Sequence, residues 1–251
     1  MSKQLLIYSK VTPLITERHK NWAIKAVEDY AFAGDLTIIP ILASEFQRVS
    51  LEYPIVFIAG EDETPLPVAV VSIDSGTNAY LNPDSSWDAA YIPAFIRRYP
   101  FIFSRSDDGE KYILCIDEEY AGILRDGDGG AGDQTLFTDS DEPSEYTQAV
   151  LDFLKVYQIE HEKTIAICKE LHERNLFERK QLSANVVNDE GQSEEKVRLS
   201  GFYTIDRARV STLKETFLIE LFRNDGLEMI YNHLASLEHF TTKRFASLQP
   251  S

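Results

Sequence analysis

The sequence predicts an α+β protein: a mainly antiparallel sheet with packed helices, and a helical C-terminal half that contains a hairpin. Three observations support this class. Short β-branched and apolar runs separated by turn residues dominate the first 120 residues. A long segment with helical periodicity begins near residue 144, and a second pair of strand-like runs follows it. Because strands and helices do not alternate regularly, parallel β-α-β units are not expected.

The N-terminal third should contain both element types. Residues 4–9 and 36–42 have the apolar, β-branched character of short strands. Between them, Thr16 can cap a helix that runs to about Phe32 and stops at Gly34. The apolar stripe of that helix would consist of Trp22, Ala23, Ala26, Val27 and Tyr30. Residues 44–51 predict a short second helix.

Strand signals continue to about residue 117. Pro54 opens an apolar run that ends at Gly60, and residues 68–74 form another such run. Residues 101–104 and 111–117 flank the turn sequence S-D-D-G-E, which predicts a β-hairpin.

The second half begins with a change of composition. Residues 125–145 are rich in Gly and Asp and predict a mobile connector. The chain 1–251 is interpreted as a single domain, with 125–143 as its only plausible internal boundary. A long amphipathic helix from Ser144 follows, with a break expected near 158–163. A hairpin around N-D-E-G-Q-S-E-E and helices at 211–223 and 227–240 complete the chain.

Composition restricts the function classes. The formal net charge is -16, and such an acidic surface repels nucleic-acid phosphates and anionic lipid. No apolar run approaches the roughly 20 residues that span a bilayer, and the N-terminus has no cleavable leader pattern, so cytoplasmic residence is expected. Cys115 and Cys168 each lie in an apolar stretch and should be buried.

The candidate site lies in the segment 87–103, W-D-A-A-Y-I-P-A-F-I-R-R-Y-P-F-I-F. Arg97 and Arg98 sit there among rings and prolines, and a buried arginine needs a carboxylate, a carbonyl or a bound anion. The alternative is that both arginines pair internally and only hold the segment in place. The candidate ligand-binding residues are Trp87, Tyr91, Arg97, Arg98, Tyr99 and His161. A small anionic molecule or a protein is the expected partner.

Catalytic signatures do not appear in the sequence. No two of the five histidines have the spacing of paired metal ligands, and His161 falls on the apolar stripe of the long helix. A site that the fold assembles from His19, His161 and His233 stays open as an oxygenase or hydrolase alternative. The loop D-G-D-G-G-A-G-D lacks the spacing of a calcium loop and is interpreted as a solvated linker. The sequence does not identify a cofactor.

Several separated segments together resemble the SapC family, a bacterial group named for association with a surface layer. The resemblance spans nearly the whole chain and is carried by Y-S-K-V-T-P-L, R-H-K-N-W, D-Y-A-F-A, I-P-I-L-A-S-E-F, Y-P-I-V-F, W-D-A-A-Y-I-P-A-F-I-R-R-Y-P-F, C-I-D-E, L-S-G-F-Y-T-I-D and I-Y-N-H-L-A-S-L-E-H-F. It implies an accessory role, linked to surface-layer or small-molecule uptake and modification systems. It supplies no catalytic residues. The absence of local catalytic signatures favours a non-catalytic accessory or binding protein. A surface-layer structural component is a further alternative.

Overall fold

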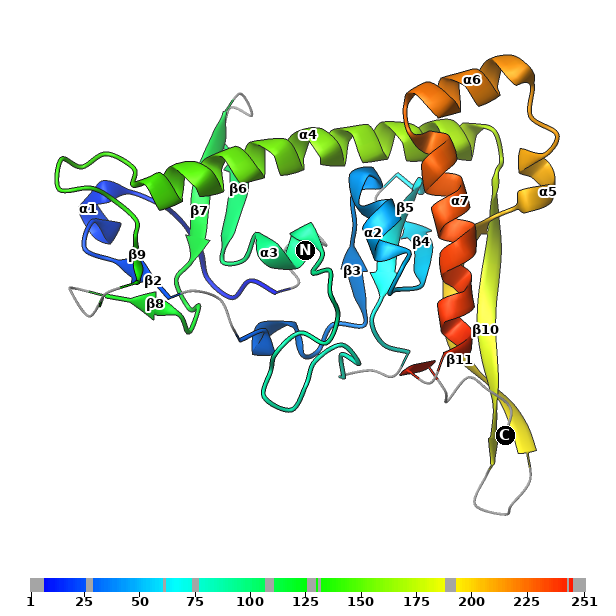
Figure 1. Ribbon diagram of the computed structural model, residues 1–251, viewed down its shortest axis with the longest axis horizontal. Coiled ribbons are helices and arrows are strands. Elements are labelled where there is room, and N and C mark those ends of the chain that lie inside the picture. The colour runs from blue at the N-terminus through cyan, green and yellow to red at the C-terminus, as the bar shows by residue number, and fades with distance from the viewer. Residues whose placement is uncertain are drawn as a thin grey trace. The chain divides into compact units, whose positions relative to one another are not determined.

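The protein is an α+β protein that the contacts divide into two compact units (Figure 1). The computed structural model describes residues 7–25, 29–60, 62–73, 77–106, 111–125, 130, 132–187, 193–242 and 244–245. Unit 1 comprises Met1–Ala33, Asn82–Trp87 and Ile96–Gln158, and unit 2 comprises Gly34–Leu81, Asp88–Phe95 and Ile159–Ser251. The stretch 125–143, where the sequence allows a boundary, therefore lies within unit 1.

Unit 1 is built on two small antiparallel sheets. The first has the order β1-β7-β6, with β1 at Val11–Pro13, β7 at Tyr112–Asp117 and β6 at Phe101–Arg105. The second has the order β8-β2-β9, with bounds Ile123–Leu124, Ala23–Ile24 and Gln134–Thr135. Unit 1 also contains the short helices α1 (Thr16–His19) and η2 (Ala31–Ala33) and the end of α3 (Ala94–Arg97).

A compact apolar core holds unit 1 together. Its buried members are Trp22, Ile24, Phe101, Ile116, Ile123, Leu136 and Leu154. Leu154 comes from α4 (Glu145–Glu173), whose residues up to Gln158 belong to this unit. Each fully buried side chain of this size stabilises the folded state by roughly 1.5–3 kcal/mol.

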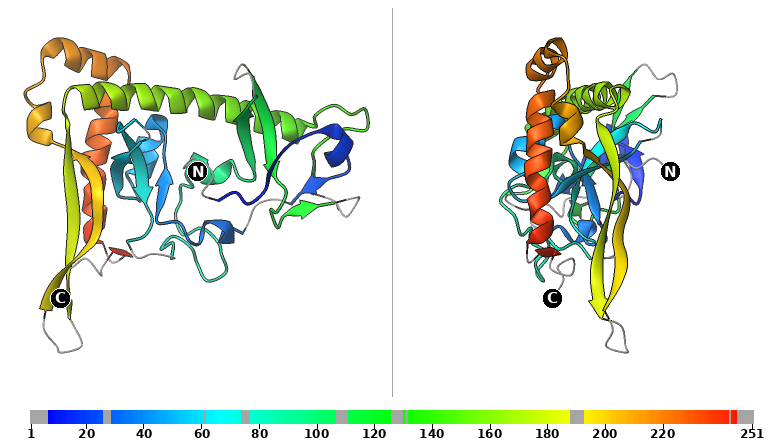
Figure 2. Two further views of the ribbon diagram at one scale, coloured as in Figure 1. Left: turned by 180° about the vertical axis from the view of Figure 1, so that it is seen from behind. Right: turned by 90° about the vertical axis from the view of Figure 1, so that its right-hand side faces the viewer.

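Unit 2 contains a five-stranded antiparallel sheet of order β10-β11-β4-β5-β3. The strands are β3 Ile38–Pro40, β4 Ile55–Ala59, β5 Pro65–Val70, β10 Phe177–Val187 and β11 Ser193–Ile205. The helices are η3 Ala43–Glu45, α2 Phe46–Val49, α5 Arg207–Val210, α6 Glu215–Arg223, α7 Gly226–Ser236 and η4 Leu237–Thr241. Figure 2 shows β10 and β11 as a long twisted ribbon with α7 alongside, in agreement with the contacts of α7 to β11 and β4.

The predicted helix from Thr16 to Phe32 is wrong. α1 ends at His19, and Ala23 and Ile24 form β2, which pairs with β8 on one side and β9 on the other. Trp22, Ala23 and Ile24 are consecutive and all buried. A helix would bury only one stripe, so pairing with distant strands overrides the local helical pattern. Residues 26–28 lie outside the described residues.

The predicted mobile connector at 125–145 is also wrong where the structure describes it. Gln134 and Thr135 form β9, and Leu136 is fully buried in the core. Ser144 then caps α4, because its side-chain oxygen accepts a hydrogen bond from the Thr147 backbone amide at 3.1 Å. Residues 126–129 and 131 are not described.

The predicted break at 158–163 does not occur, and α4 is continuous. No Pro or Gly interrupts this stretch, so nothing forces a kink. Both predicted hairpins are confirmed, as β6–β7 and β10–β11, and both cysteines are buried. Of the strand predicted at 4–9, residues 4–6 lie outside the described residues, and residues 7–9 form no strand. Within the described part of the chain, no helix is long and apolar enough to cross a membrane.

Candidate binding site in unit 1

The segment 87–103 is divided between the two units. Trp87, Arg97, Arg98 and Tyr99 belong to unit 1, whereas Tyr91 and His161 belong to unit 2. The predicted site residues therefore fall into two sets, one in each unit. Of the four predicted site residues in unit 1, Tyr99 lines a cavity that is described below.

Tyr99 lies at the centre of an aromatic cluster. The Phe32 ring stacks on it with centroids 4.2 Å apart, and Tyr8 and Tyr120 meet it in edge contacts at 5.3 and 5.2 Å. Trp87 joins this cluster only indirectly, through an edge contact with Tyr30, whose ring is 6.1 Å from that of Phe32. The cluster thus gathers rings from segments near residues 8, 30, 99 and 120.

The cluster lines a cavity of about 570 Å³. Tyr8, Phe32, Tyr99 and Tyr120 contribute rings, and Lys25, Asp29 and Glu119 contribute exposed charged groups. Gly122 permits the position of Tyr120, because a Cβ atom at residue 122 would lie 2.5 Å from its ring. The volume and aromatic lining fall within the range of small-molecule sites in proteins.

Asp117 fixes one wall of this cavity. Its carboxylate is fully buried and accepts backbone hydrogen bonds from Ser9, Lys10 and Glu119 at 2.8, 2.9 and 3.1 Å. The Tyr99 hydroxyl donates to it at 3.3 Å. Burial and the nearby Asp117 charge raise the pKa of Tyr99, so this phenol stays protonated at neutral pH. One carboxylate therefore positions both the central ring and the chain beside Tyr8.

Arg98 contacts the Tyr8 ring of the same wall. Its side chain is 4% exposed, and its guanidinium lies 4.8 Å from the ring centroid of Tyr157 and 5.8 Å from that of Tyr8. Burial raises the pKa of Tyr8, while the charge of Arg98 and its hydrogen bond to the phenol oppose this rise. Arg97 is exposed and lies over Phe153 at 5.2 Å. Neither arginine lines the cavity.

Arg98→Ala should destabilise the protein by about 2–3 kcal/mol, and Arg97→Ala by less than about 0.5 kcal/mol. The difference follows from burial, because Arg98 stacks on two rings in the interior while Arg97 is exposed to solvent. Urea unfolding of the two variants measures it directly. Equal losses in both variants would contradict the assignment of a packing role to Arg98.

A model of the SapC family matches residues 14–242 of this 251-residue chain. The chain belongs to the SapC family. Neither the curated proteins nor the solved structures contain a significant match to it. Residues 14–242 include the cavity rings of Phe32, Tyr99 and Tyr120, whereas Tyr8 precedes the matched region.

Two segments that carry the SapC resemblance meet beside the cavity wall. Glu118, from C-I-D-E, is buried and binds Arg18, from R-H-K-N-W, through two contacts of 2.6 and 2.7 Å. Lys10 Nζ and His19 Nε2 lie 2.9 and 3.3 Å from the same carboxylate. Burial acts to raise the pKa of Glu118, but the Lys10 hydrogen bond and the Arg18 charge leave it below its ordinary value. The contacts between Arg18 and Glu118 therefore tie α1 to the residue that follows β7.

Tyr91 of this SapC-family chain is held by acidic side chains in unit 2. Its hydroxyl donates to Glu45 Oε1 at 2.8 Å, and its backbone amide donates to Glu52 Oε1 at 3.1 Å. The Arg48 guanidinium lies 5.7 Å from its ring centroid. These contacts give Tyr91 a structural setting apart from the Tyr99 cluster.

Of the histidines considered for a fold-assembled site, His19 lies in unit 1, and His161 and His233 lie in unit 2. His161 is half-buried on α4, while His19 and His233 are fully buried. Within the described residues, no three His, Cys, Asp or Glu side chains gather closely enough to hold a metal ion. The described geometry therefore lends no support to a histidine site.

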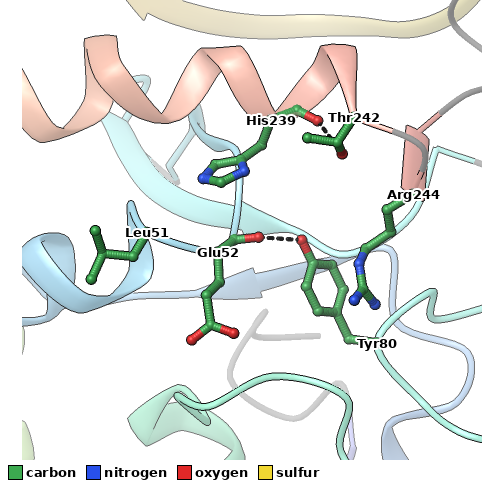
Figure 3. A pocket seen from close by; sticks show the side chains of 6 residues that line it. All are labelled: Leu51, Glu52, Tyr80, His239, Thr242 and Arg244. Carbon is green, nitrogen blue, oxygen red and sulfur yellow. Dashed lines mark hydrogen bonds between the residues drawn. The ribbon is translucent and has the colours of Figure 1, made fainter.

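A second pocket, of about 610 Å³, lies in unit 2 (Figure 3). The Arg244 guanidinium covers the Tyr80 ring at 4.0 Å and binds Asp88 at 3.0 Å. The Tyr80 hydroxyl donates to the Glu52 carbonyl at 2.6 Å, and His239 Nε2 lies 2.8 Å from the Ser50 carbonyl oxygen. The polar groups of Arg244, Tyr80 and His239 are thus already bonded within unit 2.

Proposed function

We propose that this SapC-family protein is a non-catalytic accessory protein that binds a small molecule in the aromatic cavity of unit 1. The observation that carries the proposal is the gathering of four rings, from distant parts of the chain, around a cavity of about 570 Å³. Rings of this kind supply large contact area with little loss of side-chain entropy on binding. The wall is also preorganised, because Asp117 and Arg98 hold Tyr99 and Tyr8 before any ligand arrives.

The phenol groups at the cavity support binding rather than acid-base chemistry. Burial raises the pKa values of Tyr8, Tyr99 and Tyr120, so all three phenols remain protonated at neutral pH. A general base works best with a pKa near the operating pH, and these groups are moved away from it. Burial likewise raises the pKa of both thiols, which lowers their nucleophilicity at neutral pH.

The surface-layer alternative makes a different prediction. A structural layer component self-assembles and is exported, whereas an accessory protein of the kind proposed stays in the cytoplasm as discrete particles. Cell fractionation and size-exclusion chromatography separate these two roles.

A fragment library with anionic, neutral and cationic members tests the binding role by ligand-observed NMR. We expect hits that compete for one site and weaken about tenfold or more in Tyr120→Leu, because this change removes a wall ring while leaving Tyr99 in place. Tyr231→Leu is the matched control, since Tyr231 is 53% exposed on α7 and lies outside both pockets. Thermal melting checks that each variant folds. Hits that bind Tyr120→Leu and wild type equally would remove the cavity from consideration.

A further inference from the structure

We infer that the aromatic cavity of unit 1 takes an organic cation, with its ammonium head among the rings of Tyr8, Tyr99 and Tyr120. This inference rests on the proposed binding function and names the ligand class of that site. Two features carry it: the mutual angles of the rings and the carboxylates at the cavity.

The rings enclose space from different directions. Tyr120 is inclined by 86° to Tyr99, and Tyr8 is inclined by 61° to Tyr99, so the three ring planes are far from parallel. Phe32 stacks on Tyr99 at 26° and backs this ring. Steeply inclined rings around a cavity form the kind of cage that binds quaternary ammonium groups, because each ring directs negative charge density from its face. A flat anionic ligand gains less from such walls.

The charges at the cavity favour the same sign of ligand. Asp29 and Glu119 line it against a single cation, Lys25, and the Asp117 carboxylate lies behind Tyr99. The negative charge of Asp29 is felt at the Tyr120 ring. Burial is the main cause of the raised pKa of Tyr120, and the Asp29 charge is the second. The protein as a whole carries a formal net charge of -16, which attracts cations over longer distances.

The nearby cations do not fill this role. Arg98 is committed to the rings of Tyr8 and Tyr157 and does not line the cavity. Lys25 is exposed, so its ammonium can remain in solvent while a ligand occupies the rings. Arg98 also demonstrates that a Tyr8 face in this unit accepts a cation.

Choline and 3,3-dimethylbutan-1-ol provide the decisive comparison, because they share one shape and differ in charge. Isothermal titration calorimetry on the full chain should give choline at least about tenfold tighter binding than the neutral alcohol, the factor that about 1.4 kcal/mol of cation–π and ionic attraction provides. Tyr120→Leu should weaken choline binding about tenfold. The double variant Asp29→Asn with Glu119→Gln should weaken it several-fold at low salt.

Glu145→Gln is the matched control, because Glu145 is exposed on the same unit and does not line the cavity. Glu145→Gln should leave choline binding unchanged, and Lys25→Gln should strengthen it.

Co-sedimentation with phosphatidylcholine vesicles distinguishes the sources of the ammonium group. Co-sedimentation that the cavity variants weaken in the same way as choline binding would identify a lipid headgroup. Choline binding without co-sedimentation would identify a free small molecule.

Three results would overturn the inference. Equal affinity for choline and the neutral alcohol would be consistent with an apolar binding site and with the proposed function, but it would reject a preference for cations. Choline binding that ignores the cavity variants would place the cation elsewhere. Absence of saturable choline binding, combined with neutral or anionic library hits that Tyr120→Leu weakens, would retain the cavity and reject this ligand class.

Discussion

Asp117→Ala should lower the free energy of unfolding by about 4 kcal/mol. The substitution removes the acceptor of three backbone amides and of the Tyr99 hydroxyl in a fully buried position. Each hydrogen bond to a charged group contributes about 1.5–3 kcal/mol, and each stranded buried donor adds a desolvation cost. Partial rehydration of the exposed Ser9 and Lys10 segment keeps the total below the simple sum.

Urea unfolding followed by circular dichroism measures this loss. Asp117→Asn retains one carbonyl oxygen and should fall between wild type and Asp117→Ala. Asp152→Ala is the matched control, because Asp152 is an exposed aspartate of unit 1 whose partner Lys155 is also exposed, and it should cost less than about 0.5 kcal/mol. A loss at Asp117 no larger than the loss at Asp152 would show that the carboxylate does not anchor the wall.

The second large effect concerns His233, whose neutral form fastens α7 to the sheet. Its Nδ1 lies 2.9 Å from the Ile55 carbonyl oxygen and its Nε2 lies 3.0 Å from the Ile205 amide nitrogen. A carbonyl only accepts and an amide only donates, so the proton must be on Nδ1 and the ring must be neutral. Burial lowers the pKa of His233 from 6.5 to about 4, with the Ile55 hydrogen bond opposing the fall.

This pKa gives stability a definite dependence on pH. The unfolded chain takes up the proton first, near pH 6.5, so the stabilising contribution of neutral His233 is complete above that pH. As the pH falls from 6.5 through 4, the contribution is lost, and it amounts to about 3 kcal/mol at 1.36 kcal/mol per pKa unit. Denaturant unfolding of wild type at several pH values should therefore show falling stability across this window.

His233→Gln isolates the effect from other titrating groups. Glutamine has a donor and an acceptor but does not titrate, so the variant should be less stable than wild type at pH 7 because its geometry fits the two partners less well. The stability difference between wild type and variant should shrink by about 3 kcal/mol between pH 6.5 and pH 4. If the stability difference between wild type and His233→Gln instead widens on acidification, the buried imidazole takes up a proton more readily than in the unfolded chain, which contradicts the prediction. His239→Gln, on the same C-terminal segment but only half-buried, serves as the control.

Elements defined by short-range patterns could be predicted. The hairpins β6–β7 and β10–β11 follow from strand runs around turn residues, and α4 follows from a long 3-or-4 rhythm after the Ser144 cap. The segment of Trp22 to Ile24 could not be predicted, because its conformation is set by β8 and β9, about 100 residues away. For the same reason the sequence predicts a connector at Gln134 and Leu136, although both residues pair with partners near residue 23 in the fold.

The candidate site was predicted only in part. Tyr99 lines the cavity, and Arg98 supports it from behind, but Tyr91 and His161 belong to the other unit. Tyr8, Phe32 and Tyr120 were missed as site residues, since isolated tyrosines and phenylalanines carry no local signature of a pocket. The available signal was the resemblance itself, because Y-S-K-V-T-P-L, D-Y-A-F-A and C-I-D-E lie at or next to these rings.

The α+β class, SapC membership, the two hairpins and the long helix can be predicted from the amino-acid sequence, because periodicity, turn residues and motifs are readable along the chain. The folded molecule was needed to show that one arginine is interior and the other exposed, and that Asp117, Tyr99 and Tyr8 form one wall. A cavity exists only where residues distant in sequence exclude solvent together. Burial, ring angles and the sign of the local charge arise from that meeting, and no single segment encodes them.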